Sequence, residues 1–239
     1  MSDWFKQWFG KEYLELYPHR DEHEAQAAVQ LVRNTIHGTN IGPALDLACG
    51  TGRHSRALRE WLWTAGLDLS MALLGVAATE SPGAPYVRGD MRSLPFVDHA
   101  FGLVVNFFTS FGYFDTDAQH LRVLAEVARV TRPGGTFVLD YFNADEVRRT
   151  LVPFTERVVD GRTIRQRRHI TPDGRYVEKI ITADGCDQTY QERVRLFTPD
   201  ELRMMLEESG FAIAHEYGTY NGDTWNNTSP RIILFAERE

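Results

Sequence analysis

The stretch that most constrains the fold of this chain is a short apolar run that ends in a glycine turn, 44–55, with the sequence A-L-D-L-A-C-G-T-G-R-H-S. The run 44–48 predicts a buried strand, and the pattern from Arg53 onward predicts a helix. Gly50 and Gly52 between them permit a positive-φ backbone and the close approach of a ligand. The helix that follows presents unpaired N–H groups at its start. The stretch therefore predicts a strand–turn–helix unit that cradles a nucleotide.

The dinucleotide fingerprint G-x-G-x-x-G has a third glycine where this chain has Ser55, which weakens an interpretation as an NAD site. The stretch instead resembles the first motif of the class I S-adenosylmethionine-dependent methyltransferases, an acidic residue on the strand followed by a G-x-G turn. The resemblance implies that S-adenosyl-L-methionine is the cofactor. It also implies that the cofactor is bound by Asp46, Ala48, Gly50 and Gly52.

Two later segments supply further polar groups for such a cofactor. Asp68 and Leu69 end a predicted strand, 63–69, and an acidic residue at the end of the second strand accepts hydrogen bonds from ribose hydroxyls in nucleotide-binding α/β folds. Asp90 and Met91 follow a brief third strand and resemble the third motif of the same family. That resemblance implies that Asp90 meets the adenine amino group and that Met91 packs on the ring.

The run 101–108, F-G-L-V-V-N-F-F, is almost wholly apolar and predicts a central parallel strand. Ligands of open parallel sheets bind beyond the carboxyl ends of the strands, so we expect Asn106 to border the cofactor there. Ser110 and Tyr113 are expected to meet the substrate. Tyr141 and Asn143 follow the next predicted strand, 136–141, and are expected to face the same crevice as substrate-binding residues.

An aromatic stripe fills residues 3–20. It is interpreted either as a short helix packed on the body or as a cap over the cofactor. The second interpretation comes from a resemblance of Y-L-E-L-Y-P-H-R to the N-terminal helix that closes over the methionine end in several small-molecule methyltransferases. That resemblance implies cofactor contacts from Tyr13 and Arg20. With the predicted helix 21–37, this region forms an N-terminal helical cap, 1–37.

From 154 to 197 the apolar pattern changes to a period of two with Gly-containing turns, which predicts an inserted antiparallel β-meander, here named the lid. Between 154 and 196 it carries nine basic and seven acidic side chains in a protein of net charge −7. These charges form either solvated strand faces or a wall that recognises an anionic substrate group through Arg165 and Arg168.

The order of predicted elements indicates an α/β fold: a doubly wound, mostly parallel, seven-stranded Rossmann-like sheet with the inserted antiparallel β lid, forming a single domain over 1–239. Further helices are predicted at 53–61, 70–79, 117–130 and 198–209, and closing strands at 211–217 and 231–236. The N-terminal helix and the lid resemble small-molecule methyltransferases of the glycine N-methyltransferase and amino-sugar N-methyltransferase group.

This resemblance predicts transfer of a methyl group from S-adenosylmethionine to a nitrogen or oxygen of a small-molecule acceptor. Positioning supplies much of the acceleration, because the sulfonium is already a strong electrophile. If a general base is needed, Tyr113, Tyr141 and His19 are the candidates. Two alternatives remain open: an NAD-dependent oxidoreductase on the same kind of fold, and a non-catalytic cofactor-binding module.

Composition limits the partners. The net charge of −7 and a pI near 5.6 disfavour nucleic-acid binding, which needs a basic face. No apolar run reaches the roughly 20 residues of a membrane span, and no secretory leader pattern begins the chain, so a cytoplasmic protein is expected. The two cysteines give no metal-ligand spacing, and no metal is expected. The chain is expected to be a monomer or a homodimer.

Overall fold

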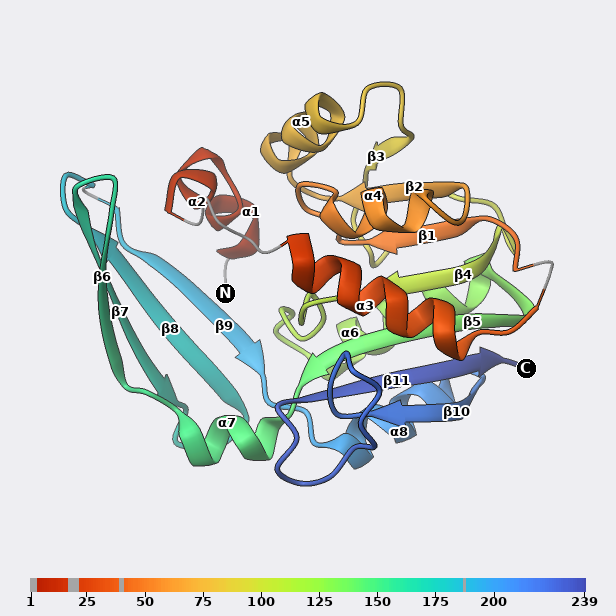
Figure 1. Cartoon of the computed structure of the whole chain (residues 1–239). Coiled ribbons are helices and arrows are strands. Elements are labelled where there is room, and N and C mark those ends of the chain that lie inside the picture. The colour runs from red at the N-terminus through yellow and green to blue at the C-terminus, as the bar shows by residue number, and fades with distance from the viewer. Residues whose placement is uncertain (1–3, 17–21, 39–40, 187) are drawn as a thin grey trace.

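The computed structural model describes residues 4–16, 22–38, 41–186 and 188–239. Its main element is a seven-stranded sheet with the strand order β10-β11-β5-β4-β1-β2-β3 (Figure 1). Neighbouring strands are parallel except where β11 pairs with β5 and with β10. The strands are β1 (Ala44–Leu47), β2 (Thr64–Asp68), β3 (Tyr86–Arg88), β4 (Phe101–Asn106), β5 (Thr131–Phe142), β10 (Phe211–Tyr217) and β11 (Arg231–Arg238). The predicted mostly parallel, seven-stranded sheet is confirmed.

The central strands β1 and β4 are buried along their whole length. Continuous apolar runs of this kind are typical of parallel strands that helices cover on both faces. Within β4, Gly102 lies so close to the backbone of Ile41 that a Cβ atom would come within 1.6 Å of the Ile41 carbonyl oxygen. A glycine inside a strand here permits the close approach of a second segment of backbone.

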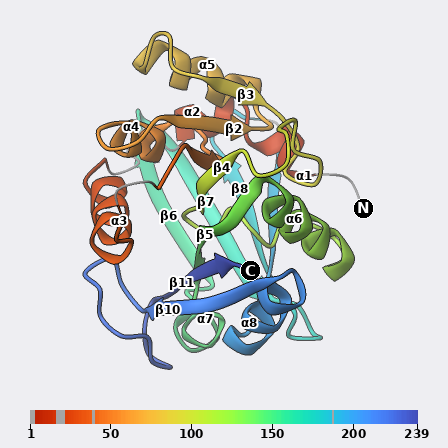
Figure 2. The same ribbon diagram turned by 90° about the vertical axis from the view of Figure 1, so that its right-hand side faces the viewer.

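Helices cover both faces of the main sheet (Figure 2). Leu103 and Val105 of β4 belong to the apolar cluster that includes α3 and α4, whereas Val104 belongs to the cluster that includes α6 and α8. Successive β4 side chains thus fill opposite cores, as the pleat requires. The helices are α3 (Glu22–Thr35), α4 (Arg53–Arg59), α5 (Met71–Glu80), α6 (Asp117–Val130) and α8 (Pro199–Glu208). The doubly wound arrangement is confirmed.

Three of these helices begin at hydroxyl side chains. Ser70 accepts a hydrogen bond from the Leu73 amide at the start of α5. Thr116 and Thr198 form capping boxes with Gln119 and Glu201 at the starts of α6 and α8. Each cap satisfies an amide that has no partner within its helix, which is why these residue types mark the helix starts in the sequence.

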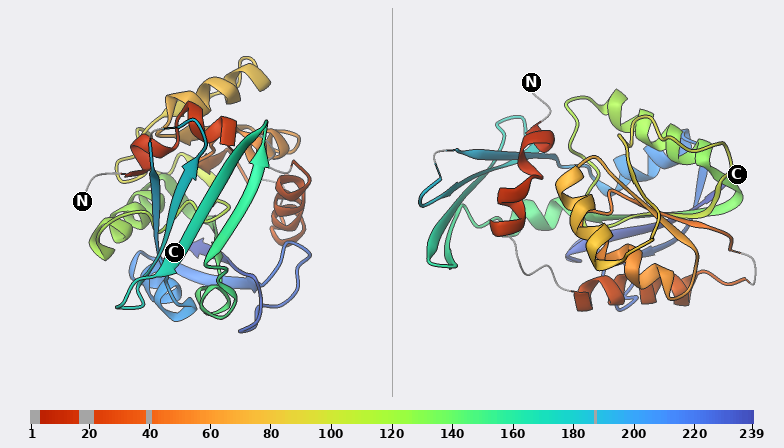
Figure 3. Two further views of the ribbon diagram at one scale, coloured as in Figure 1. Left: turned by 90° about the vertical axis from the view of Figure 1, so that its left-hand side faces the viewer. Right: turned by 90° about the horizontal axis from the view of Figure 1, so that it is seen from above.

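The lid is a separate antiparallel sheet with the order β6-β7-β8-β9, as predicted. Its strands are β6 (Phe154–Val159), β7 (Arg162–Ile170), β8 (Tyr176–Ala183) and β9 (Tyr190–Arg195). One face packs against two short helices, α1 (Trp4–Trp8) and α2 (Lys11–Leu16), through Ile164, Ile181 and Tyr190 (Figure 3). The lid therefore covers α1 and α2, and these helices lie between it and the body.

Three details differ from the sequence expectations. The aromatic stripe forms two helices that meet at Gly10 instead of one. β5 begins at Thr131 and not at residue 136, because residues 131–135 form an irregular strand start with a register shift against β4. A short helix, α7 (Ala144–Thr150), was not predicted. No described helix is long and apolar enough to span a membrane.

Candidate active site

A cavity of about 420 Å³ lies at the carboxyl ends of β1 to β4, beneath α1 and α2. This volume is in the range of small-ligand and cofactor sites. Three segments of the body line it: the turn after β1, the ends of β2 and β3, and the loop after β4. The predicted residues that it brings together are Tyr13, Ala48, Gly50, Asp68, Leu69, Asp90, Met91, Ser110 and Tyr113.

The glycine turn has a left-handed backbone at Ala48, Gly50 and Gly52, with φ angles of 61°, 57° and 78°. A Cβ atom on Gly50 would meet nothing nearer than a methyl carbon of Leu73 at 4.0 Å, so it would point into the cavity that Gly50 lines. A Cβ atom on Gly52 would instead come within 2.3 Å of the Tyr86 hydroxyl oxygen. Gly50 therefore makes room for a ligand, and Gly52 makes room for a neighbouring side chain.

Asp68 ties the end of β2 to the glycine turn. Its carboxylate accepts hydrogen bonds from the amides of Gly50 and Ser70, both at 2.8 Å. Burial raises the pKa of Asp68 above its usual value, and these amide donors oppose the rise. A carboxylate has about four acceptor positions, so the side chain keeps acceptor capacity on the cavity wall.

Asp90 is oriented by its neighbour Arg92, which donates from its backbone amide at 2.9 Å and from its guanidinium at 2.7–3.2 Å. Burial raises the pKa of Asp90, but the hydrogen bonds from Arg92 outweigh burial and hold the pKa below its usual value. The group is thus kept ionised as an acceptor beside Met91 on the cavity wall.

Three predicted cofactor residues, Asp46, Gly52 and Asn106, do not line the cavity, so their contacts with the cofactor stay predictions. Asp46 is 1% exposed and accepts a 2.6 Å hydrogen bond from the Ser55 hydroxyl. Asn106 is equally buried and donates to the Leu47 carbonyl at 2.9 Å. The side chains of Asp46 and Asn106 therefore bind residues on either side of the glycine turn and do not face the cavity.

Burial raises the pKa of Asp46 to about 6. A carboxyl whose pKa is higher in the folded state contributes stability that is complete below its unfolded pKa and is lost as the pH rises through 6. Asp46→Asn lacks this titration, so its free energy of unfolding relative to the wild type should rise by about 2 kcal/mol between about pH 4 and pH 7. Urea unfolding across this range measures the difference, and a constant difference would contradict the assignment.

The loop between β4 and α6 supplies the other side of the cavity with Phe107, Phe108, Ser110, Tyr113 and Phe114. Its far end is fastened to the base of the lid. The Phe114 amide donates to Nε2 of buried His120 at 3.2 Å. The Tyr176 hydroxyl of the lid donates to the Asp115 carbonyl at 3.1 Å.

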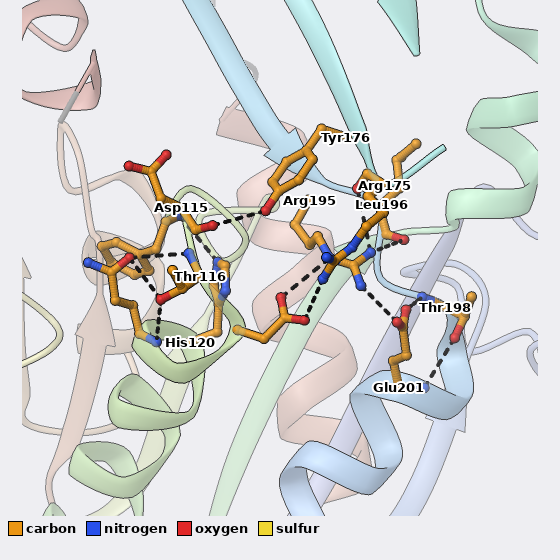
Figure 4. A network of polar contacts seen from close by, with 12 residues as sticks. Asp115, Thr116, His120, Arg175, Tyr176, Arg195, Leu196, Thr198 and Glu201 are labelled. Atoms are coloured by element: carbon orange, nitrogen blue, oxygen red, sulfur yellow. Dashed lines mark hydrogen bonds and ion pairs between the residues drawn. The ribbon is translucent and has the colours of Figure 1, made fainter. Parts of the chain in front are cut away.

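Figure 4 shows this junction, with Arg195 of β9 beside Glu201 at the start of α8. Arg195 also pairs with Asp117 at the start of α6. The Arg195 guanidinium is 5% exposed, and its nearest distances to the two carboxylates are 2.8 and 3.4 Å. A buried cation needs such partners to offset its lost hydration. The lid and the substrate side of the cavity are therefore joined at a polar, largely buried contact.

Two predicted substrate residues after β5 do not reach the cavity. Tyr141 is fully buried, and its hydroxyl donates to the Arg195 carbonyl. Burial also raises its pKa well above the usual value, so its predicted roles as base and substrate contact are wrong. Asn143 is fully buried, caps α7 and donates to the Ser229 carbonyl at 2.9 Å. Its predicted substrate contact is wrong, because the side chain is buried away from the cavity.

Neither predicted lid arginine lines the cavity. Arg165 forms ion pairs with Glu156 at 2.8 Å and Asp184 at 2.7 Å on the face of the lid away from α1 and α2, so its predicted place in the site is wrong. Arg168 lies on the opposite face, which also carries Ile164, and donates to Gln166 and Thr155. Its contact with substrate stays a prediction.

The N-terminal helices close the cavity with Phe5, Lys6, Phe9 and Tyr13. Trp8 does not line it but donates from its indole nitrogen to Glu192 of β9 at 2.7 Å, which attaches α1 to the lid. Tyr13 thus lies on the cavity wall, and its contact with the cofactor stays a prediction. Arg20 and His19, also predicted for the site, lie outside the described residues.

Sequence reasoning missed several lining residues, above all Arg53 and His54 in the first turn of α4. His54 is 5% exposed, and its ring lies 4.7 Å from that of Phe107. Arg53 is equally buried, and its guanidinium lies 4.6 Å from the centre of the Phe108 ring. Their position directly after the glycine turn could have identified both residues as part of the site.

Comparison with known proteins agrees with this geometry. A family model described as a methyltransferase domain matches residues 44–135. The dTDP-4-amino-2,3,4,6-tetradeoxy-D-glucose N,N-dimethyltransferase of Saccharopolyspora spinosa is 30% identical over 215 residues, which cover 83% of this chain and 82% of that protein. The phthiotriol/phenolphthiotriol dimycocerosates methyltransferase of Mycobacterium tuberculosis is 36% identical over 119 residues, 47% of this chain and 43% of that protein.

The crystal structure of the CcbJ methyltransferase from Streptomyces caelestis has a TM-score of 0.80 at 17% identity and covers 96% of this chain and 97% of its own. At this identity the likeness shows a shared fold. The match to the Saccharopolyspora spinosa enzyme extends over most of both chains and shows the family. The chain belongs to the class I S-adenosylmethionine-dependent methyltransferases, and it is an enzyme that transfers the methyl group of S-adenosylmethionine to a small-molecule acceptor.

Proposed function

We propose that S-adenosylmethionine is held in the cavity with its ribose at Asp68 and its adenine at Asp90 and Met91. The groups present suit it: two carboxylates can accept from the ribose and adenine donors, and the space beside Gly50 admits a ligand next to the backbone. Tyr13 and the aromatic rings of α1 complete the wall on the methionine side. The bound cofactor supplies an electrophilic methyl group on a sulfonium.

We propose further that the acceptor is the amine of an amino sugar. One observation carries this proposal: the match to the amino-sugar dimethyltransferase covers 83% of the 239 residues and so leaves out about 41. Even if all of these lay at one end of the chain, the matched stretch would include residues 42–198, and with them the whole lid. The similarity to the Mycobacterium tuberculosis enzyme covers less than half of the chain. The aligned stretch of this chain thus includes its lid, which supports an amino-sugar acceptor.

The chemistry of an amine places two demands on the site. The nitrogen must present its lone pair in line with the methyl–sulfur bond, and an ammonium must first lose a proton. Ser110 and Tyr113 lie on the cavity wall beyond the glycine turn, where they can hold the acceptor. Among the described residues, Tyr113 is the base candidate from the sequence that lines the cavity. Orientation by these groups supplies much of the acceleration, since well-placed reactants gain several orders of magnitude.

A matched acceptor series tests the amine. Methyl transfer is measured with dTDP-linked 3-amino and 4-amino deoxysugars, with their N-acetyl derivatives and with the corresponding hydroxyl sugars. We expect transfer to the free amines alone, because acetylation withdraws the nitrogen lone pair into an amide. Transfer to the hydroxyl sugars, or to none of the amines by protein that binds S-adenosylmethionine, would overturn the proposal.

We propose that Arg168 meets the phosphate groups of such a nucleotide-linked acceptor. A guanidinium suits phosphate because it donates paired hydrogen bonds. Arg168→Glu should raise the acceptor KM more than it lowers kcat. Arg165→Glu is the matched control, because it makes the same change on the opposite face of the same strand. Equal effects of both variants would count against a direct contact by Arg168.

A further inference from the structure

The loop that follows β4 carries two consecutive residues in the left-handed region, Phe108 with φ of 60° and Thr109 with φ of 58°. Non-glycine residues rarely adopt this conformation, and for a β-branched residue such as threonine it is an outlier. Residues held in this way persist only where their surroundings over-determine them, and they cluster at functional sites. Phe108 lines the cavity next to Phe107 and Ser110.

The restraint on this loop is Asp140, near the end of the neighbouring strand β5. Its side chain is 0% exposed, and Oδ2 accepts a hydrogen bond from the Phe108 amide at 2.7 Å. The Asp140 carbonyl accepts from the Thr109 amide at 3.1 Å. The Thr109 hydroxyl in turn accepts from the Phe142 amide at 3.1 Å. Both left-handed residues are thus bound to one short segment of β5.

The C-terminal hairpin orients and neutralises Asp140. Arg231 of β11 donates to both carboxylate oxygens, and the Tyr220 hydroxyl, from the loop between β10 and β11, donates to Oδ2 at 2.6 Å. Two guanidinium groups lie near the Phe108 ring: that of Arg231 is 5.5 Å from the ring centre, and that of Arg53, from α4, is 4.6 Å from it. Phe108 is therefore positioned through both its amide and its ring.

The loop after β4 lies apart from the predicted cofactor residues in the sheet. The three predicted cofactor motifs follow β1, β2 and β3, whereas the loop follows β4, on the other side of β1 in the sheet order. An acceptor has to approach the reactive methyl from a side that the cofactor does not fill. Phe108 and Ser110 of this loop line the cavity and suit an acceptor there.

We propose that Asp140 is a positioning residue for the acceptor: with Arg231 and Tyr220 it holds Phe108 and Thr109 in their left-handed conformation and so sets the acceptor wall of the cavity. This inference rests on the proposed function. Asp140 touches neither the cofactor pocket nor the acceptor itself, since it does not line the cavity. It acts through the backbone of Phe108.

Tyr220→Phe and Asp140→Asn test the proposal. Loss of a hydrogen bond to a buried carboxylate should lower kcat/KM for the acceptor by about 5- to 100-fold, with the smaller effect in Tyr220→Phe, which keeps the pair between Asp140 and Arg231. The dissociation constant of S-adenosylmethionine, measured by calorimetry, should stay within about twofold of the wild type, because the groups after β1 to β3 are unchanged. Tyr217→Phe, in the same hairpin but away from the cavity, is the matched control.

Hydrogen exchange provides a readout that needs no acceptor. In Tyr220→Phe, amides of residues 107–112 should exchange faster, while those of the glycine turn, 48–53, should exchange at the wild-type rate. Unchanged exchange at 107–112, or equal loss of cofactor affinity and acceptor kcat/KM, would overturn the positioning role. Absence of turnover on every amine would instead count against the proposed function, and the exchange comparison would still decide the role of Asp140.

Discussion

Replacing Gly50 with valine is expected to weaken S-adenosylmethionine binding by at least about 100-fold, which corresponds to about 2.8 kcal/mol. The isopropyl group would enter the cavity that Gly50 lines, because only one methyl carbon lies as near as 4.0 Å to the position of the new Cβ. The protein should remain folded, since no neighbour has to move. Calorimetry measures the affinity, and circular dichroism checks the fold.

The backbone strain of this substitution needs its own control. Gly83 also has a positive φ, 78°, and a Cβ atom there would have nothing within 4 Å. Gly83→Val therefore adds the same side chain under similar strain, about 1–2 kcal/mol, but away from the cavity. It should bind the cofactor as the wild type does. Normal binding by Gly50→Val would place the cofactor elsewhere.

Replacing Gly52 with alanine is expected to act on stability, with a loss of about 3 kcal/mol in the free energy of unfolding. Its Cβ atom would lie 2.3 Å from the Tyr86 hydroxyl oxygen, 3.0 Å from the adjoining ring carbon and 3.1 Å from the Ala77 methyl group. The residue also has a φ of 78°, which strains any L side chain. Urea unfolding measures the loss.

A second substitution separates the collision from the strain. Tyr86→Phe removes the oxygen that lies nearest to the new Cβ, so Gly52→Ala should cost less in that background than in the wild type. Tyr86→Phe alone loses the 2.8 Å hydrogen bond from Arg59 and provides the baseline. If the two changes simply add, the collision with Tyr86 is not the cause of the instability.

Much of the fold could be predicted because its signals are local. Ser70, Thr116 and Thr198 mark helix starts by accepting hydrogen bonds from amides three residues on, which depend on neighbouring sequence alone. The apolar run of β4 marks a strand buried on both faces. Acidic residues at strand ends then locate Asp68 and Asp90, since parallel strands bring those ends to one edge of the sheet.

The remaining site residues depend on tertiary contacts that have no local signal. Gly50 and Gly52 look alike in the sequence, yet one faces the cavity and the other faces Tyr86. Tyr113 follows β4 and Tyr141 lies near the end of β5, but the Tyr141 hydroxyl donates to a carbonyl at the base of the lid. Alternation along β7 could have separated Arg165 from Arg168, because residues three apart in a strand point to opposite faces.

The packing of α1 and α2 against the lid has a consequence for how this protein is made. The indole of Trp8 bonds to Glu192, which lies 184 positions later in the chain, and Arg157 bonds to the Leu16 carbonyl across 141 positions. Contacts of such long sequence separation form slowly and late. During synthesis Trp8 emerges long before Tyr190 and Glu192 of β9, so its side chain has no lid partner until that strand is made. A chain that stops before β9 therefore leaves the Trp8 ring without this cover.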